Sequence, residues 1–157
     1  PILNETDWQI IIKIHPMEKI SFYHSILSEL GINVDTNDRI CVTDGDLYSL
    51  IGRSHLLLTT RSNVGIEAVI LGTPAASYNP WTPDLLDPPY AKHGSVPLLR
   101  EPSDVVSLLT DWNGDKERAR QERMLDELYM VRGNSIATIA ALIQAEMAGS
   151  TPQSKRT

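Results

Sequence analysis

The residues best suited to chemistry form a polar turn between a strand-like run and a helical run. The strand-like run covers residues 55–59, and the apolar helical run begins at Val64. The turn between them consists of Thr60, Arg61, Ser62 and Asn63. The first N–H groups of a helix point outward and carry partial positive charge, which makes such a turn a ready phosphate site. Ser62 or Asn63 can equally act as an ordinary helix cap, and this segment alone leaves both interpretations open.

Two residues inside the following helix favour binding. Gly65 allows close approach of a ligand or of a neighbouring backbone segment. Glu67 is the only charged residue between the turn and the end of the helix, and a buried carboxylate requires partners. Its position predicts hydrogen bonds from two ribose hydroxyls of a nucleotide. An ion pair with Arg61 or Arg53 is the alternative.

His15 follows a second strand-like run, residues 9–14, and Pro16 restricts the exit of the chain. An imidazole at that point can donate a hydrogen bond to a phosphate or change its charge near neutral pH. A single histidine is also often structural, and its position alone leaves that option open. In an open α/β sheet, ligands bind beyond the carboxyl ends of the strands, where His15 and the polar turn are both expected.

Composition and missing motifs exclude several classes of protein. The 157 residues carry a formal net charge of −6, so no basic surface for nucleic acid is expected. Cys41 is the only cysteine, which excludes an internal disulfide and a cysteine-based zinc site. No apolar run reaches the length of about 18 residues that a transmembrane helix needs. The glycine-rich fingerprints of P-loop and dinucleotide-binding proteins are missing, and neither a metal nor a cofactor is predicted.

The segments that must position these residues alternate between strands and helices. The alternation predicts an α/β protein, a Rossmann-like three-layer α/β/α sandwich with a mainly parallel sheet of about five strands and with C-terminal helices. Asp46 and Ser103 are the expected caps of the helices that follow them. The expected strands cover residues 9–14, 40–42, 55–59, 75–78 and 96–99. The expected helices cover residues 18–30, 47–53, 64–71, 103–112, 115–131 and 136–147.

The remaining segments set the expected domain organisation. Residues 79–95 are rich in proline and lack periodicity, so they predict a long loop that is either functional or disordered. Residues 1–148 are interpreted as a single lobe and residues 149–157 as a disordered tail. Because the chain starts at Pro1 without a methionine, we interpret it as a piece of a longer protein.

Three segments, by their order and spacing, resemble the C-terminal, nucleotide-sugar-binding lobe of GT-B glycosyltransferases. They are Lys13–Pro16, Asp46–Ile51, and Thr60–Pro74 with its Glu67 and its Leu-Gly-Thr-Pro ending. The histidine-proline step and the serine-containing turn most resemble the capsule polysaccharide, polysialic acid and CDP-glycerol glycerophosphate-polymer transferases. The third segment is also similar to UDP-N-acetylglucosamine 2-epimerases. The resemblance covers about residues 10–145.

This resemblance implies a donor-binding role in the synthesis of surface polysaccharides or glycoconjugates. His15 and the Ser62–Asn63 turn would hold the nucleotide phosphates, with His15 stabilising the leaving group, and Glu67 would hold the ribose. The general base of these transferases lies in their N-terminal lobe, so the catalytic residue is unknown and activity of this chain alone is not expected. Relatives often carry an acidic or small residue before the serine and a second Ser or Thr after it. Arg61 and Asn63 stand at those places here, which leaves the donor nucleotide open.

The implied partners are a nucleotide-activated sugar and an N-terminal acceptor-binding lobe. The expected location is the cytoplasm, with attachment to the inner face of the membrane through the parent protein as an option. Two alternatives stay open, because a fold does not determine a function. One is a UDP-N-acetylglucosamine 2-epimerase-like lobe, and the other is a non-catalytic module that binds a nucleotide or a carbohydrate.

Overall fold

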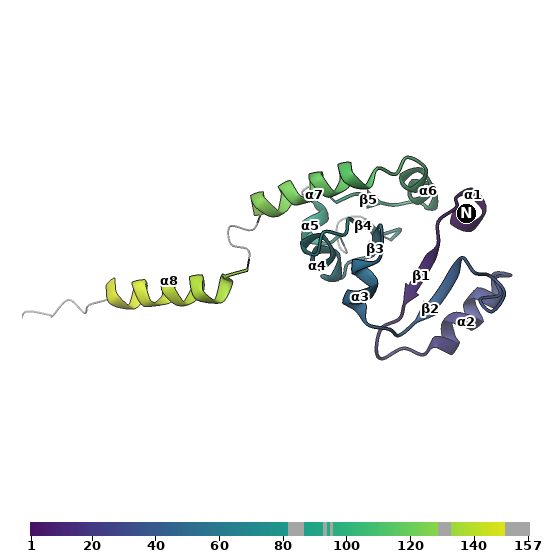
Figure 1. The fold of residues 1–157 in the computed structure, drawn as a ribbon, viewed down its shortest axis with the longest axis horizontal. Coiled ribbons are helices and arrows are strands. Elements are labelled where there is room, and N and C mark those ends of the chain that lie inside the picture. The colour runs from purple at the N-terminus through teal and green to yellow at the C-terminus, as the bar shows by residue number, and fades with distance from the viewer. Residues whose placement is uncertain (82–86, 93, 95, 129–132, 150–157) are drawn as a thin grey trace, which may run out of the picture. The chain divides into compact units, whose positions relative to one another are not determined.

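The structure is a computed structural model that describes residues 1–81, 87–92, 94, 96–128 and 133–149 (Figure 1). Part of the predicted loop at 79–95 and nearly all of the predicted tail at 149–157 lie outside the described residues. The chain divides into two compact units, residues 1–124 and residues 125–157. The interpretation of residues 1–148 as one lobe stays a prediction.

The first unit contains short parallel sheets and the helices that connect their strands. Its strands are β1 (Ile10–Lys13), β2 (Ile40–Thr43), β3 (Leu57–Thr59), β4 (Ala75–Tyr78) and β5 (Leu98–Leu99). Its helices are α1 (Ile2–Glu5), α2 (Ile20–Glu29), α3 (Leu47–Gly52), α4 (Val64–Ile70), α5 (Pro89–Lys92) and α6 (Pro102–Thr110). Helix α7 (Gly114–Leu128) begins in the first unit and ends in the second, which also contains α8 (Ser135–Gly149).

The five strands are parallel and are divided over two sheets. β1 pairs with β2, with Ile10 opposite Ile40, and α2 makes the crossover between them. β3, β4 and β5 form the second sheet in that order, with Leu57 opposite Ala75, and α4 connects β3 with β4. Parallel neighbours require such crossover connections, which is why strands and helices alternate along the chain. The expected α/β class with parallel strands is confirmed.

Local signals place the ends of several helices where they were expected. The Asp46 carboxylate caps α3 by accepting the Ser49 N–H at 2.8 Å. Gly31 and Gly72 follow α2 and α4 with φ angles of 76° and 84°. This left-handed conformation ends a helix, and glycine adopts it with little strain.

The expectation that Ser103 caps a helix is wrong. Helix α6 begins at Pro102, so Ser103 already lies inside its first turn. Proline suits the first helical position because the N–H that it lacks would have no helical partner there. The Asp104 carboxylate instead accepts the N–H groups of Arg100 at 2.8 Å and Glu101 at 2.9 Å. These two bonds hold the pKa of Asp104 below its usual range.

Small residues let α4 pack closely on the second sheet, and a buried glutamine extends that sheet. Ala68 on α4 and Ala76 on β4 are completely buried. The Gln121 side chain, which is 1% exposed, accepts the Ala75 N–H at 2.8 Å and donates to the Ala75 carbonyl at 2.9 Å. Buried backbone groups need partners, and the Gln121 amide supplies both partners to Ala75, next to the part of β4 that lies before the start of β5. These bonds attach the first half of α7 to β4.

Within the described part of the chain, no helix is both long enough and apolar enough to cross a lipid bilayer. In the second unit, helix α8 carries four exposed apolar side chains, those of Ile136, Ile139, Leu142 and Ile143.

Candidate functional site

Polar residues follow the carboxyl ends of three strands, and His15 and the Thr60–Asn63 turn were expected there from the sequence, whereas Asn79 was not. His15 follows β1, the Thr60–Asn63 turn follows β3, and Asn79 follows β4. In open parallel α/β sheets, ligands bind in the crevice outside the carboxyl ends of the strands. The local geometry of each residue decides what it can offer to a ligand.

His15 is exposed and belongs to a turn that is closed by its own neighbours. The Glu18 carboxylate accepts the His15 backbone N–H at 2.9 Å, and the Tyr23 hydroxyl donates to the same carboxylate oxygen at 2.7 Å. The bond from Tyr23, and after it the bond from the His15 N–H, holds the pKa of Glu18 below its usual range. The same contact raises the pKa of Tyr23, since its hydroxyl proton is shared with a carboxylate. Neither Glu18 nor Tyr23 was among the site residues expected from the sequence, since each reads there as an ordinary helix residue.

The Thr60–Asn63 turn supplies acceptors for the first N–H groups of α4. The Ser62 hydroxyl accepts the Val64 N–H at 3.2 Å, and the Ser62 carbonyl accepts the Gly65 N–H at 3.1 Å. Asn63 occupies the cap position of α4 with helical backbone angles and without a side-chain cap bond. The side chains of Arg61, Ser62 and Asn63 are exposed. A ligand at this turn would therefore contact mainly side-chain groups, namely a guanidinium, a hydroxyl and an amide, and fewer backbone N–H groups.

Gly65 is needed for close approach, and the approaching group is a side chain of the protein. A Cβ atom at Gly65 would lie 2.2 Å from the hydroxyl oxygen of Tyr90 and 2.7 Å from its Cζ atom. Tyr90 comes from α5, is 5% exposed, and donates to the Ser62 carbonyl at 2.7 Å. Burial raises the pKa of Tyr90 to about 12. Tyr90 therefore connects the proline-rich segment to the polar turn.

Glu67 is half-buried and keeps an accessible carboxylate. Its Oε2 atom accepts a hydrogen bond from the hydroxyl of Tyr48 at 3.1 Å, in an exposed position. That bond raises the pKa of Tyr48, because the neighbouring negative charge favours the neutral phenol. The ion pairs found among the described residues do not join Glu67 to Arg61 or Arg53, which was the alternative expected from the sequence.

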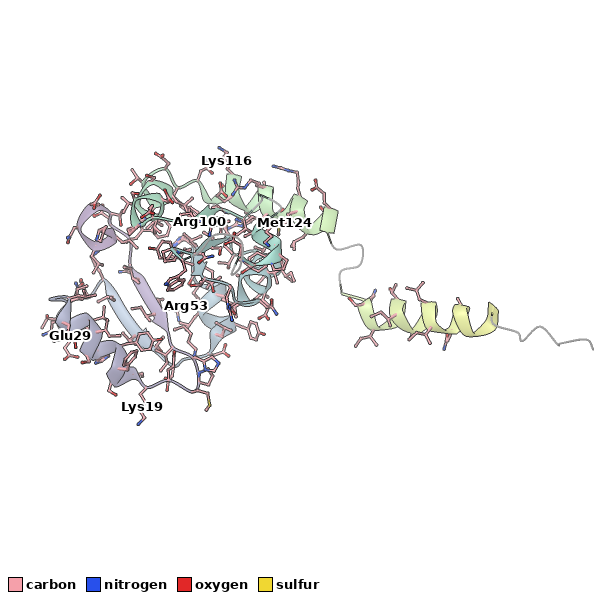
Figure 2. The ribbon with its side chains drawn as sticks, turned by 180° about the vertical axis from the view of Figure 1, so that it is seen from behind. Lys19, Glu29, Arg53, Arg100, Lys116 and Met124 are labelled. Atoms are coloured by element: carbon pink, nitrogen blue, oxygen red, sulfur yellow. The ribbon has the colours of Figure 1, made fainter. Side chains whose placement is uncertain are left out.

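A buried polar network lies at the same edge, beyond β4 and β5. The side chain of Asp87, 3% exposed, forms a two-point ion pair with Arg100, with oxygen–nitrogen distances of 2.6 and 2.8 Å. The Asn79 amide donates to Asp87 at 2.8 Å, and Arg100 donates to the Asn79 carbonyl at 3.2 Å. Arg100 lies among the strands and helices of the first unit in Figure 2. The predicted loop is thus ordered at residues 87–92, where Asp87 anchors it and α5 follows.

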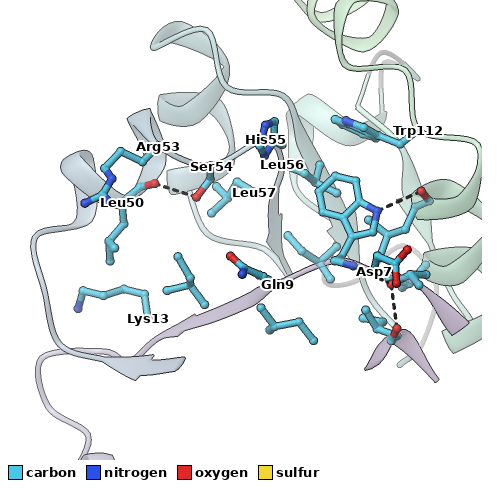
Figure 3. A pocket seen from close by; sticks show the side chains of 18 of the residues that line it. Asp7, Gln9, Lys13, Leu50, Arg53, Ser54, His55, Leu56, Leu57 and Trp112 are labelled. Carbon is cyan, nitrogen blue, oxygen red and sulfur yellow. Dashed lines mark hydrogen bonds between the residues drawn. The ribbon is translucent and has the colours of Figure 1, made fainter. Parts of the chain in front are cut away.

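A cavity of about 840 Å³ lies between β1 and β3, and Figure 3 shows the side chains that surround it. Gln9 points into it, Lys13 and Arg53 lie toward one end, and Asp7 and Trp112 lie toward the other. The backbone supplies further polar groups. Ile10 and Ile14 donate their N–H groups to residues of the β2 side, so by alternation the N–H groups of Ile11 and Lys13 face away from β2.

The described residues contain no group of three or more His, Cys, Asp or Glu side chains that could hold a metal ion. The side chains of the candidate site offer hydroxyl, amide, imidazole, guanidinium and carboxylate groups. The chain matches no known family model, no curated protein and no solved structure.

Proposed function

We propose that this chain is the donor-binding lobe of a GT-B-type glycosyltransferase, which binds a nucleotide-activated sugar or polyol. The proposal rests on the resemblance of the Lys13–Pro16, Asp46–Ile51 and Thr60–Pro74 segments. Its main structural support is the accessible carboxylate of Glu67, which already accepts a hydroxyl hydrogen bond from Tyr48. A ribose hydroxyl would make the same kind of contact, and hydrogen bonds to a charged acceptor are the stronger ones.

The neighbouring residues fit the other parts of such a ligand. Arg61, Ser62 and Asn63 are exposed and lie one helical turn before Glu67, where phosphate oxygens can accept from them. His15 at the end of β1 would donate to the leaving phosphate, an electrostatic contribution to catalysis. The general base and the acceptor site would belong to a second, N-terminal lobe. This lobe by itself would therefore bind the donor without transferring it.

The direct test replaces Glu67 with glutamine, which keeps the shape of the side chain and removes its charge. We expect the affinity for UDP or CDP to fall about tenfold, because a charge-assisted bond to the ribose becomes a neutral one. The affinity for pyrophosphate should not change, since it has no ribose. Titration calorimetry with the wild type and the variant measures both.

Tyr48→Phe is the matched control for this test. It removes the hydroxyl that occupies Glu67 in the free protein but leaves the carboxylate in place. Nucleotide affinity should stay the same or rise. If Glu67→Gln binds UDP and CDP as tightly as the wild type, Glu67 is not a ribose ligand and the proposed site is wrong.

We also propose that the two sheets join into one five-stranded parallel sheet through β1 and β3, which completes a Rossmann-like sandwich. The N–H groups of Ile11 and Lys13 face away from β2, and Leu57 donates to Pro74, so the N–H of Leu58 faces away from β4. Unpaired strand edges of this kind attract other strands. Amide hydrogen exchange should then show protection at Ile11, Lys13 and Leu58 comparable with that of Ile12 and Leu57. Rapid exchange at those three amides would mean that the sheets stay separate.

A further inference from the structure

The imidazole of His15 is held by a bond to its own turn. The Met17 N–H donates to the Nδ1 atom of His15 at 3.2 Å. A nitrogen that accepts a hydrogen bond carries no proton, so in the neutral ring the proton must sit on Nε2. The ring is exposed, which leaves that Nε2–H free to donate to a group outside the protein. The turn thereby selects one of the two tautomers.

Glu18 holds this turn closed from two directions. Its backbone N–H donates to the His15 carbonyl at 2.9 Å, and its carboxylate accepts the His15 N–H at 2.9 Å. Met17 lies between His15 and Glu18 in the chain, and closure of the turn points the Met17 N–H at the imidazole of His15. The half-buried Tyr23, in the first turns of α2, donates to the carboxylate at 2.7 Å and orients it. The chain of contacts runs from Tyr23 through Glu18 to His15.

We infer that Glu18 and Tyr23 are positioning residues that keep His15 as an outward-facing Nε2–H donor for an anionic oxygen of the ligand. The role of the anion rests on the proposed function, in which His15 contacts a phosphate. The selection of the tautomer does not rest on it, because it follows from the turn alone. A donor presented in the neutral state serves a phosphate without any need for protonation of the ring.

The first test is a long-range proton–nitrogen NMR spectrum of His15 in the free protein. The wild type should show the Nε2–H tautomer. Glu18→Ala should give a mixture of tautomers, and Glu18→Gln, which can still accept the N–H, should restore most of the wild-type state. The share of the Nε2–H tautomer in Tyr23→Phe should lie between the shares in Glu18→Ala and Glu18→Gln. A wild-type ring protonated on Nδ1, or spectra that all four proteins share, would overturn the inference.

The second test uses two replacements of the histidine itself, with pyrophosphate and UDP as the probes. Glutamine places an amide N–H near the position of Nε2, whereas asparagine imitates only Nδ1. His15→Gln should bind both probes nearly as well as the wild type, and His15→Asn should lose about tenfold, the value of one charge-assisted bond. If the two variants bind the probes equally well, the position of the donor does not matter and the role assigned to Nε2 is wrong. If the wild type binds neither probe, the proposed function fails, and the NMR spectra still decide whether the turn selects the tautomer.

Discussion

Replacement of Arg100 by methionine is expected to lower the free energy of unfolding by about 3–5 kcal/mol, the usual cost of leaving one partner of a buried ion pair without the other. Asp87 is the more buried partner, with a side chain that is 3% exposed against 29% for Arg100. Methionine fills a similar volume but offers no donor to the carboxylate. The replacement also removes both hydrogen bonds that Arg100 donates to the Asp87 carboxylate, at 2.8 and 2.6 Å. Urea denaturation of the wild type and the variant at neutral pH measures the difference.

Two controls separate this effect from a loss of packing. The double variant Arg100→Met with Asp87→Leu removes both charges, and it should recover much of the lost stability because an apolar pair can replace a buried ion pair. Asp115→Asn breaks the exposed contact between Asp115 and Arg118, which spans 3.6 Å, and it should leave the midpoint of unfolding unchanged. If Arg100→Met lowers the free energy of unfolding by less than about 1 kcal/mol, the buried pair contributes no more to stability than a surface ion pair does, and the prediction is wrong.

Gly65→Ala is expected to destabilise the protein by about 2–3 kcal/mol, although the same change inside an ordinary helix stabilises. The new methyl group would lie 2.2 Å from the hydroxyl oxygen of Tyr90 and 2.7 Å from its Cζ atom. The buried ring cannot move aside without losing its 2.7 Å bond to the Ser62 carbonyl. The clash and the lost bond together exceed the gain in helix propensity of about 1 kcal/mol. Thermal or urea unfolding shows the sign directly.

Tyr90→Ala provides the matched background for this prediction. Once the ring is removed, Gly65→Ala should become neutral or stabilising, so the two substitutions should couple strongly in a double-mutant cycle. Additive effects would mean that Tyr90 is not what requires a glycine at this position. Nucleotide affinity can be measured on the same four proteins. Because Tyr90 holds the Ser62 carbonyl, we expect Tyr90→Ala to weaken binding through the turn as well.

The sequence by itself determined the features that depend on a few neighbouring residues. The strand Ala75–Tyr78 and the start of α4 at Val64 were predicted as they are found. The Asp46 cap and the glycine that ends α4 were predicted too. The helix start, the cap and the glycine depend on contacts between near neighbours, such as the bond from the Ser49 N–H to Asp46, whereas the strand also pairs with β3 and β5. Residue type and spacing are enough to predict such local contacts, so no knowledge of the fold is needed to find them.

Only the tertiary structure decided which distant groups meet at the candidate site. Gly65 was expected to admit a ligand or a neighbouring backbone segment, and the group that approaches it is the side chain of Tyr90, from a segment that was predicted as a loop. Glu67 was expected to meet a ribose or an arginine, and it meets the hydroxyl of Tyr48.

The tertiary structure also decided which buried polar groups pair with one another. Asp87 and Arg100 read as ordinary charged residues in the sequence, as Gln121 reads as one more polar residue in a charged helix. Each acquires its role because folding brings it to a buried partner 13 or 46 residues away along the chain. The choice of such partners depends on burial and on the shape of the whole unit. An unpaired polar group costs free energy only when the folded chain excludes water from it, so the sequence by itself does not show which groups must pair.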